Sequence, residues 1–169
     1  MQRQRISPEG AILVCIVGAN HRIQWVPQSI GPEWREKLEE FIAYIQCQCE
    51  ENCLELVAEE FSEYALRENQ ADNSTAQLAA NRMNLQHLFC DPDHNERRIL
   101  GIQNEEDQEK ENEGREKEWL RRLLCSGKQR ILFICGDSHV DSFEARLVKL
   151  GHQAKILRGN WGQDWALTN

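Results

Sequence analysis

The stretch ILFICGDSHV, residues 131–140, is the clearest indication of the fold class of this chain. Five apolar residues run directly into Gly136 and then, through Asp137 and Ser138, to His139. A continuous apolar run of this length is typical of a strand that is buried on both faces, as in a parallel sheet covered by helices. A second stretch, ILVCIVGANH (residues 12–21), has the same pattern of an apolar run followed by Gly-x-x-His. The two copies therefore predict two buried strands, each of which ends at a glycine and a histidine.

Strand-like and helix-like segments alternate along the rest of the chain. Short apolar runs predict strands at about 11–17, 54–59, 85–90, 131–135 and 153–157. Amphipathic or capped segments between them predict helices at about 32–49, 61–70, 75–82, 92–101, 119–124 and 142–151. This alternation predicts an α/β fold, a mostly parallel sheet of about five strands with helices on both faces, in a Rossmann-like three-layer sandwich.

The length of 169 residues suits one domain spanning residues 1–169. One segment inside it, QNEEDQEKENEGREKE at 103–118, is almost entirely charged or amide-bearing. We interpret it as a solvated helix face or a charged lid or insert. The aromatic and glycine-rich end, residues 158–169, is expected to form a tail that packs across the domain.

The composition limits the kinds of binding partner and the cellular compartment that we expect for this chain. A net charge of −8 argues against nucleic acid or an anionic membrane as the main partner. No apolar stretch reaches the roughly 18 to 20 residues that span a bilayer. The run 11–19 after two arginines imitates a signal peptide, but it has no clear cleavage site and its pattern recurs at 131–140. Seven cysteines, several of them in apolar runs, favour a reducing, cytoplasmic setting.

Each of the first four predicted strands is followed by polar residues that could take part in catalysis or ligand binding. They are His21, the pair Glu59 and Glu60, Asp91, and His139. Ligands of open parallel sheets bind beyond the carboxyl ends of the strands, so these residues predict a polar pocket at that edge. Because Glu59 and Glu60 are consecutive, they point to opposite faces if the strand continues through both.

These residue types limit the chemistry. Two imidazoles with carboxylates could hold a divalent metal such as Mn, Zn or Co, with His21, Glu60, Asp91 and His139 as ligands and an activated water. Without a metal, a histidine could act as a general base beside a glutamate. The chain has no Gly-x-Ser-x-Gly elbow, Walker A loop or Gly-x-Gly-x-x-Gly fingerprint, which disfavours the corresponding hydrolases and nucleotide sites.

Four segments resemble the TraB/Tiki/ChaN/erythromycin-esterase-like superfamily. They are VGANH (17–21), LVAEE (56–60), GREKEWLRRL (114–123) and CGDSHVDSFEARLVKLG (135–151). Small bacterial proteins with AEEFSE and CDPD-x-x-ER motifs are also similar. The resemblance implies an α/β fold with a polar pocket, and it implies His21, Glu59 or Glu60, Arg115 and His139 as pocket residues. The superfamily often has Arg-Asp or Arg-Asn where this chain has Arg115-Glu116.

The superfamily includes metal-dependent peptidases, an esterase and a haem-binding lipoprotein, so the resemblance leaves the reaction open. Our first hypothesis is an intracellular hydrolase of a small molecule or peptide, metal-dependent or His/Glu-based. In it the histidines and Glu59 or Glu60 act as ligands or bases, and Arg115 acts as an anion clamp. The alternatives are a non-catalytic module for a small ligand, haem or nucleotide, and an interaction or defence component with a vestigial site. Arg115 could instead form a structural salt bridge and Asp91 a helix cap, and a homo-oligomer is left open.

Overall fold

The chain forms one five-stranded parallel sheet, which confirms the predicted α/β class. The computed structural model describes residues 10–26, 31–103 and 107–162. Its strands are β1 (Leu13–Ala19), β2 (Leu56–Glu59), β3 (Gln86–Phe89), β4 (Arg130–Gly136) and β5 (Gln153–Trp161). They lie in the order β3-β2-β4-β1-β5, and every neighbouring pair is parallel.

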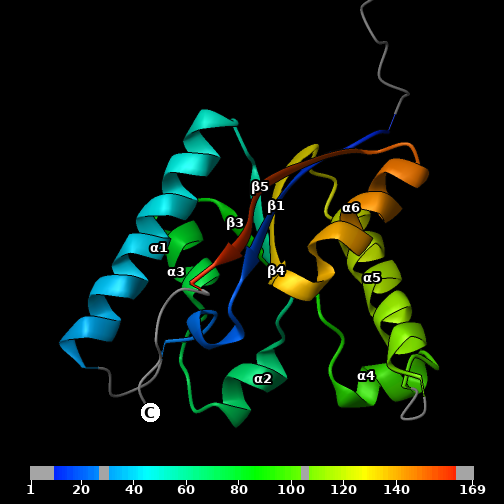
Figure 1. The fold of residues 1–169 in the computed structure, drawn as a ribbon, viewed down its shortest axis with the longest axis horizontal. Coiled ribbons are helices and arrows are strands. Elements are labelled where there is room, and N and C mark those ends of the chain that lie inside the picture. Colours follow the sequence, from blue (N-terminus) through cyan, green and yellow to red (C-terminus); the bar gives the residue numbers. More distant parts are fainter. Residues whose placement is uncertain (1–9, 27–30, 104–106, 163–169) are drawn as a thin grey trace, which may run out of the picture.

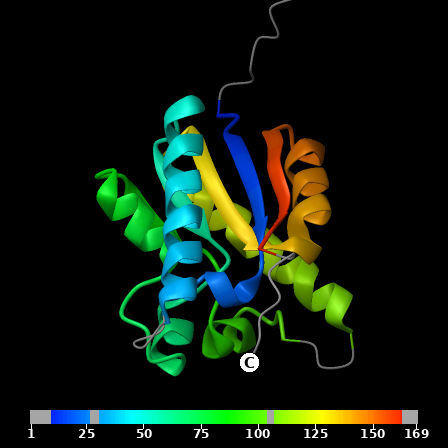
Figure 2. The ribbon, with the colours of Figure 1, turned by 60° about the vertical axis from the view of Figure 1, so that its left-hand side comes forward.

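Helices cover both faces of this sheet, so the molecule has three layers. The helices are α1 (Pro32–Glu51), α2 (Glu63–Glu68), α3 (Thr75–Arg82), α4 (His94–Ile99), α5 (Gln108–Cys125) and α6 (Val140–Lys149), with 3-10 turns η1 (His21–Ile23) and η2 (Asp137–His139). In Figure 1 the sheet is seen nearly edge-on, with α1 and α3 on one side and α5 and α6 on the other. Figure 2, turned by 60°, shows the strands running side by side toward the end of the molecule where η1, α2 and α4 lie.

The alternation of side chains along each strand explains the two helical layers. On β1, Cys15 and Val17 pack in the cluster under α1 and α3, whereas Val14 and Ile16 pack in the cluster under α5 and α6. Successive strand residues point to opposite faces, so a strand covered on both sides must be apolar at every position. This is why the apolar runs in the sequence are continuous.

The strand order places the two Gly-x-x-His ends next to each other. β4, the fourth strand along the chain, lies between β1 and β2. Ala19 at the end of β1 is in register with Gly136 at the end of β4. On the other side of β4, the Glu60 N–H donates to the Ile134 carbonyl at 2.7 Å. Residues from three separate parts of the chain therefore meet at one sheet edge.

Local hydrogen bonds explain where the shorter helices begin. Ser62 and Ser74 cap α2 and α3, each accepting a backbone N–H through its side chain. Asp93 and Glu96 form a capping box that starts α4. Gly101, with φ +66°, follows α4 in the left-handed conformation that favours glycine.

Two predicted segments differ from the structure. β5 continues to Trp161, so residues 158–161 belong to a strand rather than to a tail. Residues 108–118 form the first turns of α5, which agrees with the predicted helix face, but this face is not fully solvated because Glu116 and Glu118 are buried. The high charge of this segment concealed its role because several of its charges pair inside the protein. Residues 104–106 and 163–169, which complete the predicted lid and tail, lie outside the described residues.

Three of the cysteines, Cys47, Cys49 and Cys53, lie at the end of α1 and just beyond it, and all three thiols are free. Across the described part of the chain, none of the helices combines the length and the apolar character needed to cross a membrane.

Candidate functional site

Both glycines of the Gly-x-x-His ends are required by close packing. A Cβ built on Gly18 would lie 1.9 Å from the carbonyl oxygen of Gly159 on β5. A Cβ on Gly136 would lie 2.7 Å from His21 Nε2 and 3.4 Å from Glu60 Oε2. Gly18 thus lets β5 approach β1, and Gly136 leaves room for an imidazole and a carboxylate at the end of β4.

Glu60 lies at the centre of the cluster. It is 4% exposed and faces the α5 and α6 layer. One carboxylate oxygen accepts from Arg115 Nη2, and the other accepts the backbone N–H of Gly136 at 2.7 Å. The same Arg115-bonded oxygen is 3.6 Å from His139 Nε2. The carboxylate therefore connects β2, β4, α5 and η2 at one point.

His139 is held on its other side by a second buried carboxylate, Glu116. The His139 Nδ1 is 3.1 Å from Glu116 Oε1, and the Ser142 hydroxyl donates to the same oxygen at 2.5 Å. Arg146 Nε donates to Glu116 Oε2 at 3.3 Å. Burial alone would raise the pKa of Glu116, but the hydrogen bonds from His139, Ser142 and Arg146 outweigh burial and lower it. The imidazole of His139 thus lies between two carboxylates.

Arg115 and Asp91 form an ion-pair network beside Glu60. Arg115 Nε donates to Asp91 Oδ1 at 2.9 Å, and Trp119 Nε1 donates to the same oxygen at 2.9 Å. Arg97 Nη2 donates to Asp91 Oδ2 at 2.6 Å. Burial alone would lower the pKa of Arg115, but the charges of Asp91 and Glu60 raise it overall. Asp91 therefore anchors arginines, and Arg115 forms salt bridges that fix the carboxylate at the centre.

Glu59 lies away from this cluster, on the opposite face of β2. It is fully buried, and its Oε1 accepts from Ser74 Oγ and lies 2.7 Å from His87 Nε2. The sequence prediction that consecutive glutamates diverge agrees with this placement. The structure brings His21, Glu60, Arg115, His139 and Asp91 to one edge and leaves Glu59 on the other side.

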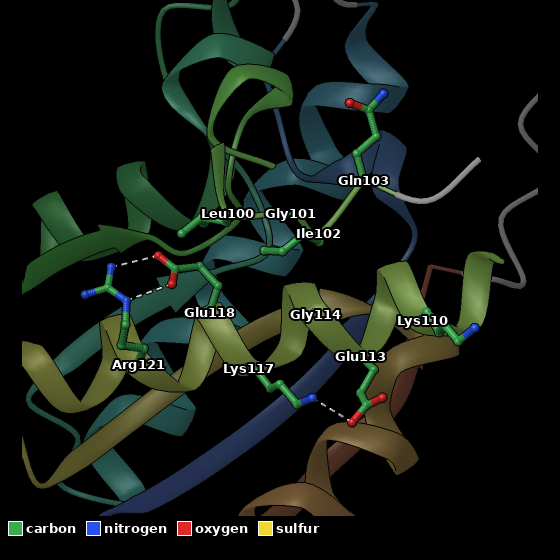
Figure 3. Close-up of a pocket in the computed structure, with 10 residues that line it drawn as sticks. All are labelled: Leu100, Gly101, Ile102, Gln103, Lys110, Glu113, Gly114, Lys117, Glu118 and Arg121. Carbon is green, nitrogen blue, oxygen red and sulfur yellow. Dashed lines mark hydrogen bonds and ion pairs between the residues drawn. The ribbon is translucent and has the colours of Figure 1, made fainter. Parts of the chain in front are cut away.

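A hollow of about 600 Å³ opens beside His139, between the first half of α5 and the start of α6. It is lined by Gln108, Glu109, Asn112, Glu113, Glu116, Ser138, His139, Ser142 and Arg146. A second hollow, of about 520 Å³, lies where Leu100, Gly101, Ile102 and Gln103 approach α5 (Figure 3). Charged groups on its α5 wall pair within that helix, Lys117 with Glu113 and Arg121 with Glu118, and no predicted site residue lines it. The hollow beside His139 is therefore the better candidate for a substrate.

The predicted metal ligands do not form a metal-binding group. Among the described residues, no three His, Cys, Asp or Glu side chains are arranged to hold a metal ion. The carboxylate oxygens that would bind a metal already accept hydrogen bonds. Those of Glu60 accept from Arg115 and from the Gly136 N–H, and those of Asp91 accept from Arg97, Arg115 and Trp119. The residues in this arrangement do not fit a divalent cation, and we derive no step through one.

Sequence reasoning missed three residues of the cluster, Glu116, Ser142 and Arg146. Glu116 was missed because it belongs to the charged segment 103–118, which we interpreted as a solvated helix face or lid. Ser142 and Arg146 follow His139 at spacings of three and seven, which place all three on one side of a helix. That spacing was the signal available in the sequence.

Comparisons of this chain with protein-family models, with curated proteins and with solved structures give no match.

Proposed function

We propose that this chain is a hydrolase that works by acid–base catalysis at the edge formed by His21, Glu60 and His139. One observation carries the proposal: imidazoles from two separate strand ends lie at the same edge of the sheet as one buried carboxylate. His139 Nε2 is 3.6 Å from Glu60 Oε1, and the His21 ring and Glu60 Oε2 both lie within 3.4 Å of the point that a Gly136 Cβ would occupy. The resemblance to the TraB/Tiki/ChaN/erythromycin-esterase-like superfamily remains a prediction consistent with this proposal.

The two histidines have different environments and therefore different roles. His21 is exposed, so its ring is accessible to a water or a substrate at the surface of the edge. His139 is 5% exposed, lines the hollow, and is oriented by Glu116 in the way a carboxylate orients a catalytic histidine. We assign the activation of water to His21, which takes up the proton of the water, and the delivery of a proton to the leaving group to His139, which acts as an imidazolium held between Glu60 and Glu116. Proton exchange with solvent restores both rings after turnover.

Glu60 stabilises the positive charge of the His139 imidazolium and, after proton uptake from water, that of His21. Its carboxylate is held in position by the Arg115 ion pair and the Gly136 N–H, so it does not need to reorganise during the reaction. Arg115 acts through Glu60 in this scheme. The substrate is a small molecule or a peptide that occupies the hollow beside His139 and extends from it to His21, which does not line the hollow.

The test is turnover of a panel of chromogenic carboxyl esters, amides and phosphate esters by the purified chain. We expect turnover of one class, with kcat reduced about 10²- to 10⁴-fold in His21→Gln and in His139→Gln. The matched control is His94→Gln, because His94 is exposed on α4 and is not part of the cluster. Absence of turnover for every class, or an equal loss in the control, would contradict the proposal.

A second candidate is a binding module without turnover. It is favoured by the arginines of the cluster, because Arg97, Arg115 and Arg146 each pair with carboxylates of the chain itself. Such saturated pairs are typical of a rigid scaffold. In that case small-molecule screening by thermal shift should find a stabilising ligand that is recovered unchanged. Screening should include haem and nucleotides, and stoichiometric Mn, Zn or Co that is lost in His139→Ala would restore the metal hypothesis.

A further inference from the structure

Gln24 is a buried polar side chain beside an exposed histidine. It is 1% exposed and follows directly after η1, the turn that carries His21. Buried amides usually exist in proteins for the hydrogen bonds they make. Gln24 therefore requires a structural reason for its position at the sheet edge.

Its contact with His21 selects one form of the ring. Gln24 Oε1 lies 3.1 Å from His21 Nδ1. In this orientation of the Gln24 amide, its Nε2 is buried without a hydrogen-bond partner among the described residues, and its oxygen faces the ring. An amide oxygen only accepts hydrogen bonds, so this orientation pairs with the neutral ring that carries its proton on Nδ1. The lone pair of the neutral imidazole is then on Nε2, which is the nitrogen that can accept a proton from a substrate or a water.

That nitrogen faces the proposed site. The point that a Cβ on Gly136 would occupy is 2.7 Å from His21 Nε2 and 3.0 Å from His21 Cε1. Glu60 Oε2 lies 3.4 Å from the same point. The basic nitrogen of His21 is thus directed to the end of β4, beside the carboxylate at the centre of the cluster.

The N-terminus of α3 holds Gln24 in place. Thr75 N donates to the Gln24 carbonyl at 2.9 Å, and Thr75 Oγ1 donates to the Ile23 carbonyl at 2.5 Å. Trp25 and Ser74 also form an antiparallel bridge. A three-residue turn makes few hydrogen bonds of its own, so these long-range bonds fix its position.

Glu59 completes the support from inside the sheet. Its carboxylate accepts from the side chain of Ser74, which at the same time accepts the N–H of Gln77 at 2.9 Å as the cap of α3. Glu59 therefore contributes to the site indirectly, through the helix terminus that holds the turn.

We propose that Gln24 is a positioning residue that fixes the Nδ1–H tautomer of His21 and directs its basic Nε2 toward Gly136 at the end of β4. The proposal rests on the proposed function, because it assigns the form in which His21 acts. It extends that function by giving a role to the α3 terminus, which does not touch the cluster.

The experiment reads the tautomer directly, by long-range ¹H–¹⁵N correlation of the histidine rings at a pH where His21 is neutral. We compare the wild type with Gln24→Met, which keeps the length of the side chain without the acceptor, and with Gln24→Glu, which restores an acceptor. Gln77→Met is the control, since it changes a partly buried glutamine at the same helix terminus without contacting His21. Thr75→Val removes one support of the turn by a nearly isosteric change and replaces Gln24→Met if that variant does not fold.

We expect the wild type and Gln77→Met to show the Nδ1–H form of His21. Gln24→Met should move the ring toward the Nε2–H form, with Gln24→Glu recovering Nδ1–H and Thr75→Val intermediate. With a turned-over substrate, kcat should fall about 10²-fold in Gln24→Met, with a smaller change in KM. A wild-type ring in the Nε2–H form, or a tautomer that Gln24→Met leaves unchanged, overturns the proposal. The spectra do not depend on turnover, so failure of the hydrolase proposal is distinguished from failure of this one.

Discussion

Replacing Arg115 by methionine tests whether the ion-pair network holds the site together. Arg115 is buried to 12% side-chain exposure, and it pairs with both Glu60 and Asp91. Its guanidinium also lies 5.3 Å from the ring centre of Trp119. Methionine keeps the apolar stem and removes the charge, which leaves Glu60 buried without its arginine. Asp91 retains Arg97, so the cost falls mainly on Glu60.

Removing one partner of a buried ion pair costs about 3–5 kcal/mol. For a chain of this length, each kcal/mol lowers the melting temperature by roughly 2–4 °C, so Arg115→Met should lower it by about 6–20 °C. Thermal unfolding followed by circular dichroism at neutral pH measures this. The control is Arg67→Met, because Arg67 is 68% exposed and its pair with Glu63 is 3.9 Å long. An exposed pair of this kind contributes about 0–1 kcal/mol.

A double variant checks the cause. Arg115→Met combined with Glu60→Gln removes both charges, so it should be more stable than Arg115→Met alone, and the two effects should not add. The reasoning is refuted if Arg115→Met costs no more than Arg67→Met, or if Glu60→Gln makes Arg115→Met worse. Either result would mean that Glu60 does not depend on Arg115 for its charge balance.

Three further outcomes follow from the geometry. Gly18→Ala should reduce the free energy of unfolding, measured by urea titration, by about 1–3 kcal/mol or more, because its Cβ would collide with a backbone carbonyl. The control Gly159→Ala should change it little, because a Cβ there would have no atom of the described residues beyond its chain neighbours within 4 Å. The folded-state pKa of Glu116 is lowered from 4.5, so its stabilising contribution is fully present above about pH 4.5 and is lost as the pH falls through the lowered value. The stability difference between wild type and Glu116→Gln should therefore narrow on acidification, and a difference that stays constant down to pH 2 would contradict this assignment. Phe143→Ala should cost roughly 3–5 kcal/mol, because Phe143 is fully buried against the rings of Trp119 and Phe133, and a loss below 1 kcal/mol would show that α6 is not packed as described.

The sequence allowed prediction of the site residues that follow the strand ends, but not of the side chains that contact them. The strand ends at His21, Glu60 and His139 were visible because apolar runs end abruptly there. The partner of His139 was not visible, because Glu116 lies 23 residues earlier in a segment whose composition is typical of solvent-exposed helix. The sequence does not show whether a charged side chain is solvated by water or paired with a buried imidazole. Only the packing of the folded chain distinguishes these two environments.

Local patterns in the sequence were sufficient to predict the class of the fold. Continuous apolar runs require burial on both faces of a strand, and helical segments between them require parallel crossovers, so a covered parallel sheet was the predicted result. The sequence also determined that Glu59 and Glu60 diverge, because side chains alternate along a strand.

The order of the strands, and the choice of Glu60 over Glu59 for the cluster, depend on long-range packing. The insertion of β4 between β1 and β2 brings Gly136 against His21 and Glu60, and this order depends on long-range pairing that local patterns do not encode. Glu60 joins the cluster because its face of the sheet is covered by α5, which carries Arg115. Glu59 faces the layer of α3 and holds its N-terminus instead. Gly136 and His139, which follow the strand ILFIC, contact Glu60 and Glu116, and both glutamates come from segments that are distant in the sequence.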